Sequence, residues 1–121
     1  MQPMLLCIGM EQNQLMRISF AASALGIRIT AVQETEWGQT IGALCGLDSR
    51  KITPTKERVT EPMLVMAFFD SALMDRLLRS LREGKVIVRL KAVLTPYNRY
   101  WTCGQLFQHL CQEAAQMGQM Q

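Results

Sequence analysis

The sequence predicts one α/β domain over residues 1–121, with a ferredoxin-like arrangement of two βαβ halves, a four-stranded sheet and an extra C-terminal helix. Apolar runs at 3–8 and 62–67 both begin Pro-Met-Leu, 59 positions apart. Each run is followed by apolar residues at helical spacing and then by a second strand-like stretch. One more amphipathic stretch ends the chain. The alternative fold is a doubly wound parallel sheet.

In the first half, residues 4–8 are apolar on both alternating faces, which is typical of a central strand covered above and below. Asn13 is placed to cap a helix that ends at Gly26, a residue suited to the left-handed backbone just past a helix. The apolar stripe of this helix consists of Leu15, Ile18, Ala22 and Leu25. The stretch 27–33 alternates apolar and polar residues, which indicates an edge strand.

The second half repeats this order. Residues 63–69 predict another central strand, Asp70 caps the next helix, and Gly84 is expected in the left-handed position at its end. The apolar stripe of this helix consists of Leu73, Met74, Leu77, Leu78 and Leu81. The alternating stretch 86–94 is the second edge strand. First strands in the centre and second strands at the edges favour the ferredoxin-like order, in which each crossover leaves room for a strand of the other half.

The halves are expected to be pseudo-repeats, at 3–46 and 62–117, joined by an exposed linker at 47–61. If both helices cover one face of the sheet, the other face needs cover of its own. The last helix supplies it with the apolar stripe Leu106, Phe107, Leu110, Cys111, Ala114 and Met117. The stretch 40–45 is a poorer cover, because it is punctuated by glycines. We therefore expect a homodimer that hides the remaining apolar surface.

Composition limits the classes of function. Thirteen Lys and Arg against ten Asp and Glu give a net charge of only +3, so we expect no dedicated nucleic-acid binder. No apolar run is long enough to span a membrane and no export signal is evident, so we expect a cytoplasmic protein that makes no membrane contact. The four cysteines include no Cys-x-x-Cys pair, and His109 is the single histidine. We therefore expect reduced thiols, no metal site and no cofactor.

The candidate site lies where the second edge strand breaks at Thr-Pro and leads into the last helix. Lys91 and Arg99 supply cationic groups, and Thr95 and Asn98 supply polar ones. Thr102 begins the helix with Gln105 three residues later, which is the spacing of a capping box. Because a helix N-terminus attracts anions, these residues predict a binding or regulatory module for a small anionic ligand or a protein partner.

Two other functions remain as alternatives. A small enzyme would use Lys91 or Cys103, since a thiol in the first helical turn has its pKa lowered by the helix dipole. However, His109 lies two turns away and no base accompanies the thiol, so the sequence assigns no catalytic residue. Weak nucleic-acid binding is the other alternative. A row of arginines at 76, 79 and 82 favours it, but interleaved acidic residues dilute their field.

The second half also resembles a known family. The sequence Leu-Lys-Ala-Val-Leu-Thr-Pro at 90–96 is followed by Asn98, by Trp-Thr at 101–102 and by Leu106. Together with the apolar strand from residue 62, this pattern is similar to the small bacterial proteins grouped as domain-of-unknown-function family 3783. The first half keeps Trp37 but lacks the Lys-Ala-Val-Leu-Thr-Pro sequence. The resemblance implies no activity, substrate or catalytic residue.

Overall fold

The computed structural model describes residues 1–51 and 55–119. Within them, four strands form one sheet in the order β2-β1-β3-β4. The strands are β1 (Met4–Ile8), β2 (Arg28–Val32), β3 (Met63–Ala67) and β4 (Leu90–Val93). The helices are α1 (Gln12–Ala24), α2 (Ile41–Leu44), α3 (Ser71–Glu83) and α4 (Cys103–Gln119), with short 3-10 turns η1 (Glu34–Glu36) and η2 (Asn98–Tyr100). The predicted mixed α/β class, with a four-stranded sheet and a C-terminal helix, is confirmed.

The central and edge strands are those that the sequence predicts, but the ferredoxin-like order is not confirmed. Strand β1 pairs in parallel with β2, and β3 pairs in parallel with β4. The central pair β1 and β3 is antiparallel, with Leu6 opposite Val65 at its middle. Each crossover therefore joins two neighbouring strands instead of spanning a strand of the other half. The antiparallel centre also excludes the doubly wound parallel sheet.

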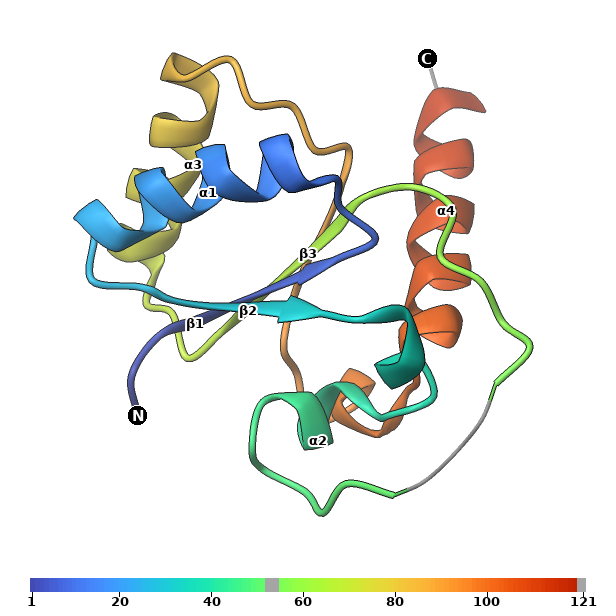
Figure 1. Cartoon of the computed structure of the whole chain (residues 1–121). Helices are drawn as coiled ribbons and strands as arrows, with labels where there is room; N and C mark the ends of the chain where they lie inside the picture. The colour runs from blue at the N-terminus through green and yellow to red at the C-terminus, as the bar shows by residue number, and fades with distance from the viewer. Residues whose placement is uncertain (52–54, 120–121) are drawn as a thin grey trace.

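Helices α1 and α3 cover one face of this sheet (Figure 1). Ile18 of α1 and Leu77 of α3 are both 0% exposed and pack in the same cluster as the strand residues Leu5 and Leu64. Because β-strand side chains alternate, the neighbouring residues of β1 and β3 face the other way. The two layers of core follow directly from that alternation.

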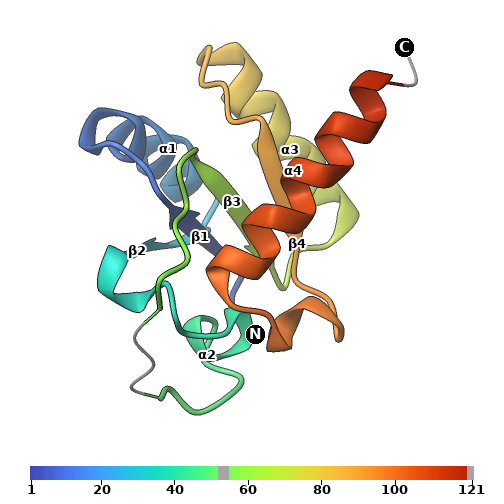
Figure 2. The same ribbon diagram turned by 90° about the vertical axis from the view of Figure 1, so that its right-hand side faces the viewer.

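The second face is covered by α2 and α4 together (Figure 2). All four residues of α2 are buried, so this short helix is a better cover than its glycines predict. It is held at its start by Thr40, whose side chain accepts a hydrogen bond from the Ala43 N–H at 3.1 Å. The stripe of α4 is confirmed at Leu106 and Leu110, whereas Met117 is 66% exposed. No uncovered sheet face is left to require a second copy.

The two halves correspond element by element. Each has a first strand, a 13-residue helix, a second strand, a 3-10 turn that ends at a tryptophan, and a helix that begins after a threonine. Thr40 and Thr102, which precede α2 and α4, form an antiparallel bridge with each other. This pairing brings the equivalent parts of the halves together at one end of the sheet. Common ancestry of the halves stays a prediction.

Three local predictions are wrong for identifiable reasons. Helix α1 begins at Gln12, so Asn13 lies inside its first turn instead of capping it. Helix α3 ends one residue later than predicted: Gly84 has φ −81°, and Lys85 takes the left-handed conformation with φ +57°. Strand β4 is shorter than 86–94 because its partner β3 begins after Pro62, which has no N–H to extend the ladder.

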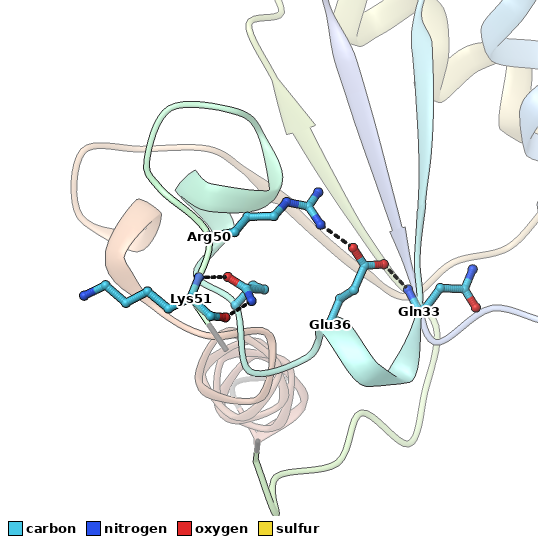
Figure 3. Close-up of polar contacts among 5 residues, drawn as sticks. Gln33, Glu36, Arg50 and Lys51 are labelled. Atoms are coloured by element: carbon cyan, nitrogen blue, oxygen red, sulfur yellow. Dashed lines mark hydrogen bonds and ion pairs between the residues drawn. The ribbon is translucent and has the colours of Figure 1, made fainter. Parts of the chain in front are cut away.

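Linker residues 52–54 lie outside the described residues. The described flanks carry both exposed and buried side chains, and several of their residues are bonded to the rest of the fold. Arg50 and Glu36 form an ion pair, drawn in Figure 3, with their nearest atoms 2.6 Å apart. The Lys51 N–H donates to the Gln39 side-chain oxygen at 3.0 Å, and the Gln39 amide donates to the Lys51 carbonyl. Further along, Val59 is only 6% exposed. The described flanks of the linker therefore pack as part of the domain surface.

Candidate functional site

The predicted site residues Thr95 and Asn98 form a closed turn. The Thr95 N–H donates to Asn98 Oδ1 at 2.8 Å, and the Asn98 N–H donates back to Thr95 Oγ1 at 3.0 Å. The Asn98 amide also donates to the Val93 carbonyl at 2.9 Å, and the residue is 7% exposed. With its amide satisfied by backbone, Asn98 holds the end of β4 against η2. Its first role is structural.

Arg99 is paired with a carboxylate from the linker. Its guanidinium donates to both oxygens of Asp48, at 2.6 Å and 3.2 Å, and lies 5.1 Å from the Tyr100 ring centroid. The hydrogen bond from Arg99 lowers the pKa of Asp48, and the same bond raises the pKa of Arg99. An external anion would have to compete with Asp48 for this group.

The N-terminus of α4 also has an internal anion. The capping box is confirmed, because the Thr102 N–H donates to Gln105 Oε1 at 2.9 Å and the Gln105 N–H donates to Thr102 Oγ1 at 3.2 Å. The Thr102 hydroxyl donates in turn to Glu57 Oε1 at 3.1 Å. A Cβ at Gly104 would lie 2.5 Å from Glu57 Cβ, so the glycine permits this close approach. Glu57 thus occupies the place predicted for a ligand.

Lys91 lines two pockets. It shares one of about 310 Å³, beside α4, with Thr95 and Asn98. The other, of about 510 Å³, lies between the end of α3 and the chain leading into β4, and we call it the α3–β4 pocket. Lys91 Nζ donates to the Val88 carbonyl at 2.5 Å. The residues that line the α3–β4 pocket are Leu78, Leu81, Arg82, Lys85, Val86, Ile87, Val88 and Lys91. Of the five predicted residues, Lys91 alone lines this pocket.

Two cations of this pocket, Arg82 and Lys85, are missing from the sequence prediction. The spacing of three places Arg82 with the outer arginines of α3, and a left-handed Gly84 would leave Lys85 outside the helix end. The 59-residue offset between the halves aligns Lys85 with Gly26, which indicates that Lys85 takes the left-handed position at the end of its helix. Both residues are left-handed, with φ +57° and +74°. A lysine where the other half has glycine was visible in the sequence.

The cysteine chemistry expected from position is contradicted. Cys103 is 0% exposed, and its pKa is raised to about 12, first by burial and then by the charge of Glu36. Burial therefore outweighs the dipole of α4. Burial also raises the pKa of Cys7 to about 12 and the pKa of Cys45 to about 11. None of these three pKa values favours a thiolate nucleophile near neutral pH.

His109 lies on the exposed side of α4. Its Nε2 is 3.0 Å from a carboxylate oxygen of Glu113, one turn along, and its ring centroid is 4.9 Å from that of Trp101. Within residues 1–51 and 55–119, no three histidine, cysteine or acidic side chains are grouped as metal ligands. The His109 ring packs against the Trp101 ring.

Residues 62–117 match the family model of a domain of unknown function, DUF3783. The match spans the elements from β3 into α4, and it confirms the resemblance of the second half. It brings no activity with it. The comparison with curated proteins found no match, and the comparison with solved structures found none. No helix in the described part of the chain is long and apolar enough to cross a membrane.

Proposed function

We propose that the α3–β4 pocket binds a small ligand that has an apolar body and an anionic end group. One observation carries the proposal: the pocket is lined by five apolar and three cationic side chains, and no carboxylate is among its lining residues in the described chain. An excess of one charge around an apolar hollow favours amphipathic anions.

The apolar part of the pocket provides the first half of this recognition. Leu81 and Val88 are 4% and 5% exposed, so the pocket has a floor that belongs to the core. Ile87, by contrast, is 84% exposed at its wall. A volume of about 510 Å³ lies in the range that holds small organic ligands. A ligand seated there would remove apolar surface from water.

The cations provide the second half. Arg82 and Lys85 form no ion pair within the described residues, and both are exposed. Lys91 Nζ donates to one carbonyl and, as an ammonium group, has further hydrogens for an anion. A carboxylate or phosphate near these groups would accept charge-assisted hydrogen bonds.

The dipole of α3 gives a competing explanation, because cations are favoured near a helix C-terminus. It accounts for Arg82, which lies in the last turn. It does not account for Lys91, which lies on a strand. Nor does it explain why Lys85 occupies a left-handed position, where a residue other than glycine costs about 1 kcal/mol. Such strain is typical of functional positions.

The test compares anions with neutral molecules of the same body. Octanoate, phenylpropanoate and hexyl phosphate are titrated by calorimetry and thermal shift, each beside its alcohol. We expect one or more anions to bind and the matching alcohol to bind at least tenfold more weakly. Lys91→Met, which keeps the apolar stem, should weaken binding about tenfold. Arg76→Ala removes a cation of the same helix outside the pocket and should leave binding unchanged.

Equal binding of acid and alcohol, or equal weakening by Lys91→Met and Arg76→Ala, would contradict the proposal. Thermal unfolding of each unliganded variant separates a lost ligand contact from a lost fold.

A further inference from the structure

The outer face of α1 is apolar at its middle and carries a single charged residue. Phe20 is 83% exposed and Met16 is 61% exposed, one turn apart on the helix. The one charged residue within α1 is Arg17, and its guanidinium donates to the Gly84 carbonyl at 2.6 Å. The other exposed side chains of α1 are neutral: Gln12, Asn13, Ser23 and Ala24. A solvated helix face ordinarily carries charge, so this face differs from the expected pattern.

The fold does not require this face to be apolar, as α3 demonstrates. Both helices have 13 residues and cover the same face of the sheet, and the 59-residue offset aligns them. It aligns Phe20 with Arg79 and Met16 with Asp75, both of which are exposed and charged. Equivalent positions therefore tolerate charge without loss of the buried stripe. Exposed apolar residues that packing does not need indicate an interaction surface.

The open edge of the sheet lies on the same side of the molecule. Figure 2 shows α1 and β2 together on one flank, with α3, β4 and α4 on the other. Strand β2 is an outer strand, and Arg28 is its one charged residue. It contains no proline, so its sequence leaves the edge able to pair with another strand. The opposite edge, β4, carries Lys91 and follows Arg89, which is paired with Glu61 at 2.7 Å.

We propose that α1 and β2 form the interface between two copies of this chain. A two-fold dimer brings each patch against itself, so the exposed apolar residues Met16 and Phe20 meet their counterparts. Arg17 is the one charge that each α1 brings, and its guanidinium is already bonded to the Gly84 carbonyl. The equivalent outer positions of α3 carry charges instead of apolar groups. Antiparallel pairing of the two β2 edges places Thr30 near the axis and continues the sheet across both copies. The α1 helices then lie side by side over the seam.

The assembly is tested on the full chain by light scattering after gel filtration and by sedimentation velocity. We expect a mass about twice the 13.7 kDa of the chain at tens of micromolar. Phe20→Asp places a charge in the proposed dimer interface and should give a monomer. Arg79→Asp makes the matching change at the equivalent position of α3 and should leave the dimer intact. Both positions are exposed, so neither variant is expected to unfold the chain.

Amide hydrogen exchange tests the part played by β2. In the wild-type dimer, β2 amides should exchange more slowly than in Phe20→Asp, while β1 amides should exchange alike in both. A monomeric wild-type chain at 200 micromolar would overturn the proposal. A dimer that survives Phe20→Asp, or one that Arg79→Asp dissociates equally, would also overturn it. These results are separable from the ligand proposal, because neither Phe20 nor Arg79 is among the residues that line the α3–β4 pocket.

Discussion

Helices α1 and α3 have the same place in their halves but present different surfaces. Ile18 and Leu77 are equivalent and both are 0% exposed, whereas Phe20 and Arg79 are equivalent, exposed and chemically opposite. The sheet constrains the inner positions, because each helix must bury an apolar stripe on it. It leaves the outer positions unconstrained. Equivalent inner residues therefore explain the fold, and unequal outer residues identify where the halves have separate functions.

A second contrast concerns the backbone. The first half has Gly9 and Gly26 in left-handed conformations, at φ +69° and +74°. The second half has Phe68 and Lys85 at the equivalent places, at φ +65° and +57°. Glycine adopts this conformation without steric cost, and other residues do not. The second half thus carries backbone strain that the first half avoids, and Lys85 lines the α3–β4 pocket.

The largest expected effect tests whether the inner positions are equal. Leu77→Ala and Ile18→Ala each remove a fully buried side chain from the same cluster, so each should lower the free energy of unfolding by about 2–5 kcal/mol. Urea unfolding monitored by circular dichroism measures both. If either variant lowers the free energy of unfolding by less than about 1 kcal/mol, the two helices are not packed alike and their inner positions are not equivalent.

Substitutions at the two left-handed residues Gly26 and Lys85 should change the free energy of unfolding in opposite directions. A Cβ at Gly26 meets nothing within 4 Å, so Gly26→Ala costs backbone strain alone, about 1–2 kcal/mol. Lys85→Gly relieves that strain and should gain up to about 1 kcal/mol, or roughly 4 °C in Tm. The same variant removes a cation from the α3–β4 pocket and should weaken anion binding. A stabilised variant with unchanged binding would separate Lys85 from the proposed function.

The N-terminal caps of α1 and α3 should differ by a smaller amount in the stability that they contribute. Asp70 caps α3 by accepting the Leu73 N–H at 2.7 Å, whereas the equivalent Glu11 makes no side-chain cap on α1. Asp70→Ala should therefore lower the free energy of unfolding by about 1 kcal/mol. Glu11→Asp keeps the charge and supplies a shorter acceptor, so it should gain roughly 0.5 kcal/mol. Chemical denaturation resolves both changes. Identical responses of the two positions would remove this difference between the halves.

The sequence predicts the elements and the strand positions well, because these depend on local apolar patterns. It does not predict which strands are neighbours, since both strand orders bury the same residues. It places Asp70 and Thr102 correctly, because a capping side chain acts within three residues. It does not reveal the partners of the predicted site residues, because these partners are remote in sequence: Asp48 reaches Arg99 and Glu57 reaches Thr102 from the linker. No local pattern reveals that those polar groups already have partners.

The smallest expected effect is a pH dependence from the ion pairs that tie the linker flanks to the second half. Hydrogen bonds from Arg99 and Arg89 lower the pKa values of Asp48 and Glu61 in the folded chain. A lowered folded pKa means that the stabilisation is present above the unfolded pKa and is lost as pH falls through the folded one. The free energy of unfolding should therefore decline from about pH 5 towards pH 3.

Asp48→Asn should reduce stability at pH 6 and make that decline shallower. Asp75→Asn is its control, because Asp75 is exposed on α3 and is in no ion pair within the described residues. Urea unfolding at intervals between about pH 3 and pH 6 measures both slopes. Equal slopes for the two variants would mean that the Asp48–Arg99 pair does not hold the linker to η2. Arg99 would then be available to an external anion, as the site predicted at Lys91, Thr95, Asn98, Arg99 and Thr102 requires.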